Sequence, residues 1–106
     1  MSEPFANKQV TVGNPNGLHL RPAEMFAHAA SRYDSKIDVI KDGQRVDGKS
    51  ILSIVTLAAT QGANLIIEAT GRDAEEAVRS LAELIEHYST FGEAAETGTN
   101  TNSETI

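Results

Sequence analysis

The sequence contains no cysteine, so disulfide bonds and thiolate metal sites are excluded, and the absence fits a reducing compartment. Long apolar runs are also missing, because no stretch approaches the roughly 20 residues that a membrane-spanning helix needs. The first residues, MSEPFANKQ, lack the basic region and the apolar core of a secretory signal peptide. These absences predict a cytoplasmic protein with no membrane partner.

Positive charge is scarce as well, since 9 Lys and Arg side chains stand against 15 Asp and Glu, for a net charge of −6. A nucleic-acid-binding domain needs a clustered basic face to neutralise phosphates, and no stretch of this sequence supplies one. We therefore expect no nucleic-acid partner.

Large apolar residues become rare after Tyr88. Residues 89–106 (STFGEAAETGTNTNSETI) are rich in Thr, Asn, Glu and Gly, and their three glutamates account for half of the net charge. Such a segment cannot bury enough apolar surface to offset the entropy of ordering it. We expect residues 1–6 to be an N-terminal lead, residues 7–88 to be one folded domain, and residues 89–106 to be a disordered acidic tail.

The length of 106 residues suits one small domain, and the patterns within it predict seven elements. Alternating apolar residues predict strands, and apolar residues that recur every three or four positions predict helices. Asp42-Gly43 is a hairpin-turn signal. Ser50 is expected to cap a short helix, and Asp73 with Glu76 forms a capping arrangement before the last one. The predicted strands are at about 8–13, 37–39, 44–46 and 63–70, and the predicted helices at about 20–32, 51–59 and 74–88.

The order of these elements is βαββαβα. Four strands and helices of this length predict an α+β fold in which three helices cover one side of a four-stranded antiparallel sheet. We therefore expect an open-faced β-sandwich.

The chemistry is expected at the start of the first helix, in NPNGLHLRPA (14–23). A helix N-terminus has unpaired N–H groups and a partial positive charge, which make it an anion site. His19 directly precedes this terminus, and Arg21 lies in its first turn. Imidazole is the side chain best suited to act as a nucleophile near neutral pH, and helix amides and a guanidinium would stabilise a phosphoryl group on it. The site suits holding a phosphoryl group and passing it on.

The other two histidines, His28 and His87, lie on predicted helices away from any cluster. The three histidines lack metal-ligand spacing, so we expect no metal and no cofactor. A single histidine before a helix is more often a cap or a surface residue than a nucleophile, so the position of His19 alone leaves both interpretations open.

The motif GLHLRPA (17–23) resembles the phosphorylation site of the HPr family, the histidine-containing phosphocarriers of the phosphoenolpyruvate-dependent sugar phosphotransferase system. The likeness extends to DGKSIL (47–52), TLAATQG (56–62) and GRDAEEAVRSLAELIE (71–86), in the same order. It covers about Asn7 to Tyr88 and implies an HPr-like fold. Leu20 departs from the family, because many relatives have a small or polar residue there.

The resemblance implies a phosphocarrier rather than an independent enzyme, and a monomer. His19 would take the phosphoryl group on a ring nitrogen, with enzyme I as donor and a sugar-specific enzyme IIA domain as acceptor. Arg21 would steady the phosphoryl group, and Asn16 and Gly17 would shape the loop before it. The implied apolar docking patch consists of Leu20, Ile51, Leu52 and Val55.

Ser50 has two interpretations. It is a helix cap from its position alone, whereas in the HPr family a serine here is phosphorylated in some bacteria by HPr kinase/phosphorylase. A phosphate would add about −1.5 to −2 charge beside the docking patch. Regulation and simple capping stay open alternatives.

Two other functions also stay open. One is a carrier in a regulatory, nitrogen-type phosphorelay without sugar transport, which the site residues do not separate from sugar uptake. The other is a non-catalytic regulatory binding module that acts through phosphorylated Ser50. His19 and Arg21 argue against the second, because a pure regulator needs no nucleophile.

Overall fold

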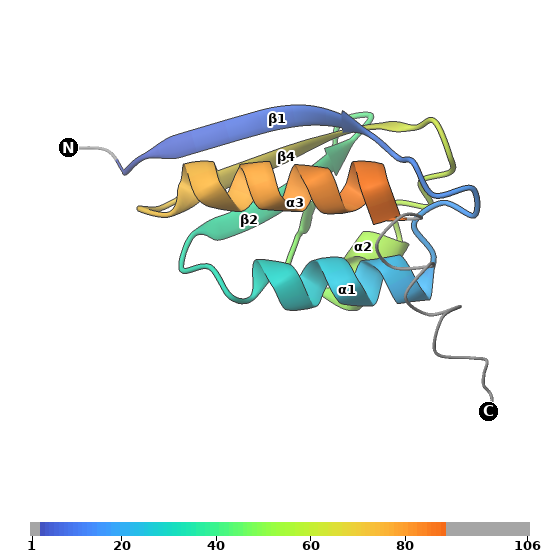
Figure 1. The fold of residues 1–106 in the computed structure, drawn as a ribbon, viewed down its shortest axis with the longest axis horizontal. Helices are drawn as coiled ribbons and strands as arrows, with labels where there is room; N and C mark the ends of the chain where they lie inside the picture. The colour runs from blue at the N-terminus through green and yellow to red at the C-terminus, as the bar shows by residue number, and fades with distance from the viewer. Residues whose placement is uncertain (1–2, 89–106) are drawn as a thin grey trace.

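The computed structural model describes residues 3–88, and its elements follow the predicted order βαββαβα. Three helices lie on one side of a four-stranded sheet (Figure 1). The predicted open-faced sandwich is therefore confirmed. The elements are β1 (Phe5–Thr11), α1 (Leu20–Ala30), β2 (Lys36–Lys41), β3 (Gln44–Asp47), α2 (Ile51–Val55), β4 (Asn64–Thr70) and α3 (Ala74–Tyr88).

The sheet has the strand order β1-β4-β2-β3, and every neighbouring pair is antiparallel. β1 pairs along its whole length with β4, from Phe5 opposite Thr70 to Thr11 opposite Asn64. It begins three residues before the predicted start at Lys8, because its first residues pair with the end of β4. The strand thus includes part of residues 1–6, expected as a lead, while the predicted tail lies outside the described residues.

The core lies between the sheet and the helices. On β4 the alternation predicts an inward face, and Leu65, Ile67 and Ala69 are fully buried there. Full burial of one Leu, Ile or Phe side chain contributes about 1.5–3 kcal/mol, so these positions hold the helices against the sheet. The predicted apolar stripe of α3 consists of Ala74, Ala77, Val78, Leu81, Ile85 and Tyr88, and the first five of these are buried.

The helix α2 is shorter than predicted, because it ends at Val55 and not near Ala59. After Val55 the backbone tightens, since the N–H groups of Leu57 and Ala58 donate to carbonyls three residues back. Ala58 then takes a left-handed conformation with φ 49°, which stops the helix. Gly62, the first glycine after the helix, lies further along the chain.

Asp73 was predicted to form a capping arrangement with Glu76, and the structure gives its carboxylate another role. It accepts hydrogen bonds from the backbone N–H groups of Asp34 (2.9 Å) and Ser35 (3.0 Å), and from the Ser35 hydroxyl. These bonds join the start of α3 to the turn before β2. The hydrogen bond from Ser35 is the largest cause that lowers the pKa of Asp73.

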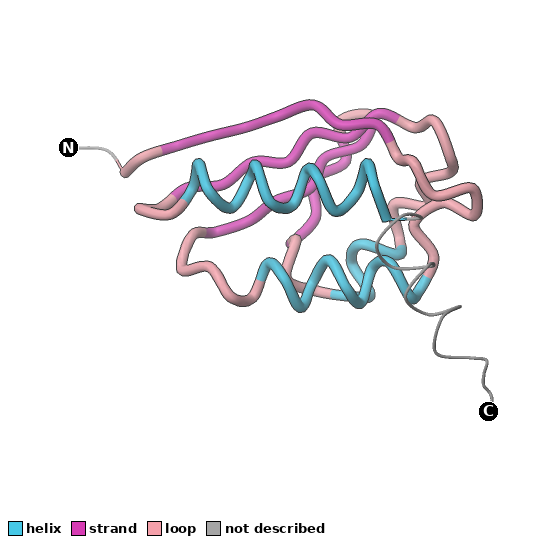
Figure 2. Tube along the Cα trace, in the orientation of Figure 1, coloured by secondary structure: helices cyan, strands magenta, loops and turns pink. Residues whose placement is uncertain are grey.

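Several connections meet at one end of the molecule, where α1 begins and α3 ends (Figures 1 and 2). The N–H of Gly13 donates to the carbonyl of Ile85 on α3 (3.3 Å), and the N–H of Leu18 donates to the carbonyl of Ala59 after α2 (2.8 Å). The loop before α1 is therefore held between the two other helical segments. Within residues 3–88, no helix has the length and apolar character to cross a membrane.

Candidate functional site

His19 is the N-cap residue of α1 and is exposed. Its backbone is extended (φ −80°, ψ −169°), and its carbonyl accepts the first helical hydrogen bond, from the N–H of Ala23 (3.1 Å). The side chain makes no capping hydrogen bond to the helix. The imidazole therefore lies at the positive end of the helix dipole without being used to cap the helix.

The first turn of α1 favours negative charge from a partner. It contains Arg21, which is exposed, and no acidic residue. Pro22 is buried in this turn, where its missing N–H costs nothing, because the first helical N–H groups have no partner within the helix. The remaining N–H groups and the Arg21 guanidinium give this end of the helix a net attraction for anions.

The loop before His19 is held by a residue that the sequence analysis did not single out. Asn14 is fully buried, and its side-chain amide contacts the backbone of both Asn16 and Gly17. Asn16 itself is exposed and takes part in this network through its backbone N–H. The sequence NPNG does contain a signal for this turn, because Asn followed by Pro favours a turn that the Asn side chain closes.

Gly17 is required at its position for two reasons. Its φ of +75° is a conformation that favours glycine, and a Cβ there would lie 2.4 Å from the carbonyl oxygen of Ala59. The predicted role of Gly17 in the shape of the loop therefore has a direct steric basis in the close approach to the segment after α2.

The residues of the predicted docking patch differ in exposure. Leu20 on α1 and Leu52 on α2 are 59% and 74% exposed, and α1 packs against α2. Ile51 and Val55 are partly buried and pack against the core. The apolar surface that a partner can reach on these two helices is therefore formed chiefly by Leu20 and Leu52.

Ser50 caps α2 as predicted, because its side-chain oxygen accepts a hydrogen bond from the N–H of Ser53 (3.3 Å). Its own N–H donates to the carbonyl of Asp47 (3.2 Å). The neighbouring Lys49 points away toward the turn between α1 and β2, where its ammonium group donates to the carbonyl of Tyr33 (2.8 Å). Ser50 is partly exposed, so its hydroxyl lies at the surface between β3 and the docking patch.

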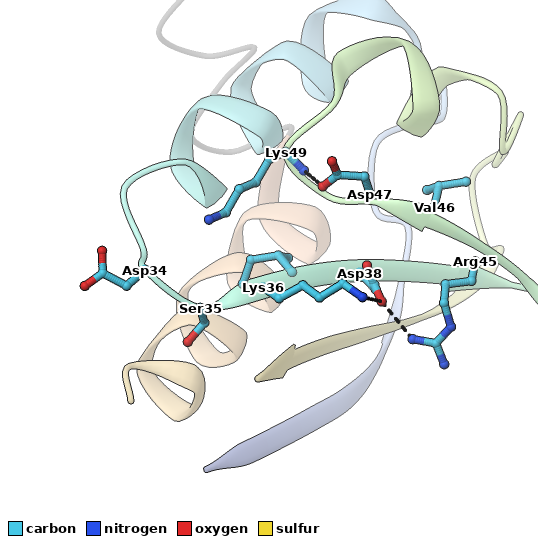
Figure 3. Close-up of a pocket in the computed structure, with 9 residues that line it drawn as sticks. Asp34, Ser35, Lys36, Asp38, Arg45, Val46, Asp47 and Lys49 are labelled. Carbon is cyan, nitrogen blue, oxygen red and sulfur yellow. Dashed lines mark hydrogen bonds and ion pairs between the residues drawn. The ribbon is translucent and has the colours of Figure 1, made fainter. Parts of the chain in front are cut away.

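A pocket of about 510 Å³ lies at the β2–β3 hairpin, and no predicted site residue lines it (Figure 3). Several of its charged lining residues form ion pairs. Arg45 donates to Asp38 (2.9 Å) and to Glu68 (2.6 Å), and the hydrogen bond to Glu68 is the largest cause that raises the pKa of Arg45. Lys36 adds a longer contact to Asp38 (3.8 Å). This pocket is therefore a feature of the sheet and not the candidate site.

No group of three or more His, Cys, Asp or Glu side chains in residues 3–88 is arranged to hold a metal ion. The chemistry that the described residues offer is that of an exposed imidazole beside helix N–H groups and a guanidinium.

Comparison with known proteins shows the family to which the chain is similar. The family model "PTS HPr component phosphorylation site" matches residues 6–87. The phosphocarrier protein HPr of Borreliella burgdorferi is 43% identical over 84 residues, which cover 79% of this chain and 98% of that protein. The HPr-like protein Crh of Halalkalibacterium halodurans is 39% identical over 82 residues, with 77% and 98% covered. The crystal structure of HPr from Bacillus anthracis superposes with a TM-score of 0.74 at 41% identity, and covers 76% of this chain and 96% of that one.

Proposed function

The chain belongs to the HPr family of phosphocarrier proteins, and we propose that it accepts a phosphoryl group from phospho-enzyme I on His19 and passes it to an enzyme IIA domain. The observation that carries the proposal is the exposed imidazole of His19 at the N-cap of α1. In this proposal the chain acts in the cytoplasm as a monomer, and donor and acceptor use the same surface in turn.

The transfer step needs little from the protein besides position and charge. A lone pair on a ring nitrogen of His19 forms the N–P bond while the bond between phosphorus and enzyme I breaks. The phosphoryl oxygens then face the N–H groups at the start of α1 and the Arg21 guanidinium. The N–H groups are fixed by the helix backbone before the reaction, so their stabilisation of the transferred charge needs no rearrangement. The same atoms release the group when the acceptor attacks the phosphorus.

Docking is proposed to rest on Leu20 and Leu52. Both are large apolar side chains that are more than half exposed, and they belong to the two helices next to His19. A partner with a complementary apolar surface would bury them and bring its own phosphoryl site to His19. Ile51 and Val55 would then support the patch from beneath.

Ser50 carries a second proposal, in which its phosphorylation regulates docking. The hydroxyl is at the surface and at a helix N-terminus, which accepts added negative charge. The phosphate would lie directly before α2 and its exposed Leu52, so it would oppose burial of the patch. HPr kinase/phosphorylase is the class of enzyme that would add it.

The nitrogen-type phosphorelay and the binding module that acts through phosphorylated Ser50 remain alternatives. The phosphorelay uses the same chemistry at His19 as sugar uptake and differs only in its acceptor proteins. Neighbouring genes that encode sugar permeases would therefore favour sugar uptake. The second needs no chemistry at His19, and is therefore excluded if His19 takes a phosphoryl group from enzyme I.

The test is an assay with labelled phosphoenolpyruvate, enzyme I and this protein. The wild type should be labelled, His19→Ala should not, and His28→Ala and His87→Ala should be labelled normally. The adduct should be labile in acid and stable in base, as an N–P bond is. Labelling of His19→Ala at the wild-type level would refute the assignment of His19.

A further inference from the structure

The loop from 14 to 17 is organised by one side chain. Asn14 Nδ2 donates to the carbonyl of Gly17 (3.1 Å), and Asn14 Oδ1 accepts from the N–H of Asn16 (3.2 Å). The N–H of Gly17 in turn donates to the backbone carbonyl of Asn14 (2.9 Å). Three hydrogen bonds thus close a four-residue turn, and two of them use the amide of Asn14.

Asn14 is buried, so the loss of either of its side-chain hydrogen bonds would be destabilising. Its exposed fraction is 0%, so its donor and its acceptor are both removed from water and both are used inside the loop. A buried polar group that loses its partner costs roughly 1–3 kcal/mol, so the turn keeps this amide in a single arrangement. An amide has its donor and its acceptor on separate atoms, so it can bind the carbonyl of Gly17 and the N–H of Asn16 at the same time.

The turn leads directly to His19. Gly17 lies two residues before it, and the N–H of Leu18, between them, is bound to the carbonyl of Ala59 (2.8 Å). On its other side, His19 is held by the hydrogen bond from Ala23 to its carbonyl (3.1 Å). Because the side chain of His19 makes no capping bond, the direction of its imidazole depends on the backbone held at these two places.

We propose that Asn14 is a positioning residue for His19, which fixes the backbone before His19 and so aims the imidazole at the incoming phosphorus. The inference rests on the proposed phosphocarrier function. A reacting atom displaced by about 1 Å can slow a reaction by roughly 100-fold, so a loosened loop should lower the rate within the complex. The docking patch on α1 and α2 is separate from the turn, so binding of enzyme I should change little.

Two variants of Asn14 distinguish the contributions of its two side-chain hydrogen bonds. Asn14→Ala removes both, whereas Asn14→Asp keeps the acceptor for Asn16 and places an oxygen against the carbonyl of Gly17. In the assay with enzyme I, both should lower kcat by roughly 10- to 100-fold and leave KM for this protein nearly unchanged. The matched control is Ser35→Ala, which removes a hydrogen bond of another buried polar residue, at the far end of α1, and should lower the Tm but not kcat.

A second measurement needs no partner. Three-bond NMR couplings of His19 should report one dominant χ1 rotamer in the wild type and in Ser35→Ala, and averaging in both Asn14 variants. Wild-type couplings in both variants, or wild-type kcat at a temperature where they are folded, would overturn the proposal. If the wild type takes no phosphoryl group, the proposed function fails, and the couplings alone decide the role of Asn14.

Discussion

The backbone N–H of Leu18 donates a 2.8 Å hydrogen bond to the carbonyl oxygen of Ala59. Leu18 directly precedes the candidate nucleophile His19, and Ala59 belongs to the segment that follows α2. The bond therefore connects the loop that carries His19 to the segment that follows α2, the helix that Ser50 caps and that carries Leu52. A steric clash at this contact is expected to affect both segments.

Gly17→Ala should disturb both segments. The added Cβ would lie 2.4 Å from the carbonyl oxygen of Ala59, and alanine at a φ of +75° is strained by about 1–2 kcal/mol even without that contact. We expect a loss of at least that free energy of unfolding and a Tm lower by about 4–8 °C per kcal/mol. Thermal unfolding measures the loss. Gly43→Ala is the control, since its φ is +84° but its Cβ meets nothing, and an equal loss would show that the contact has no effect.

Leu52→Ala and Leu20→Ala should weaken docking without loss of fold. Truncation of a central apolar residue in an interface costs about 1–2 kcal/mol, so KM with enzyme I should rise by roughly 5- to 30-fold. Both side chains are more than half exposed, so the Tm should change little. Ile66→Ala removes an exposed apolar side chain from the opposite face of the sheet and should leave KM unchanged. The same rise in all three variants would argue against a patch on α1 and α2.

Ser50→Asp should separate the effect of residue 50 on the stability of α2 from its effect on docking. The carboxylate can cap α2 as the hydroxyl does, and negative charge at a helix N-terminus contributes about 0.3–1 kcal/mol. The Tm should therefore stay the same or rise. Transfer from enzyme I should slow through a higher KM, because the interface must desolvate an unpaired charge beside Leu52. Melting curves test the expected Tm, and saturation kinetics test the expected rise in KM. An unchanged KM would exclude regulation of docking by charge at Ser50.

Ala58→Gly should stabilise the protein. Ala58 is exposed and has a φ of 49°, a conformation that costs a non-glycine residue about 1–2 kcal/mol. Glycine removes this strain, but the greater conformational entropy of the unfolded chain costs about 0.4–1 kcal/mol, so a net gain of up to about 1.6 kcal/mol is expected. Denaturant unfolding measures it. Ala29→Gly, within α1, should have the opposite sign, and a loss of stability in both variants would contradict the strain at Ala58.

Asp73 should make stability depend on pH in acid. Its pKa in the folded protein lies below the ordinary value of 3.8, chiefly because the Ser35 hydroxyl donates to the carboxylate. The stabilisation is therefore complete above the unfolded pKa and is lost as pH falls below about 3.8 toward the folded pKa. Denaturant unfolding over this range should show a smaller acid loss for Asp73→Asn than for the wild type. Parallel curves would mean that Asp73 does not contribute.

Much of the fold follows from local pattern. The apolar period of α3 predicts its buried stripe, and the alternation in β4 predicts its inward face, because both patterns depend only on the geometry of a single element. The position of His19 and Arg21 at a helix start also follows from local pattern, because Pro22 favours the first turn of a helix.

The sequence analysis missed features that depend on distant partners or on backbone strain. Asp73 binds the turn at Asp34 and Ser35, which is far away in the sequence, so a local capping rule cannot identify that partner. Ala58 ends α2 in a conformation that alanine rarely adopts, so no residue preference marks the stop. The role of Asn14 depends on its burial, which the loop composition does not reveal.

The position of β1 in the sheet affects the order in which the chain can fold. β2 and β3 are joined by a short turn and can pair early, whereas β1 has β4 as its partner, and Phe5 meets Thr70 only after the intervening chain has been made. Closing such a long loop costs entropy before any contact is gained, which slows folding. During synthesis on a ribosome, the first strand must therefore wait, unpaired, until β4 has emerged. The segment that precedes His19 can therefore reach its final geometry only after β4 has been made.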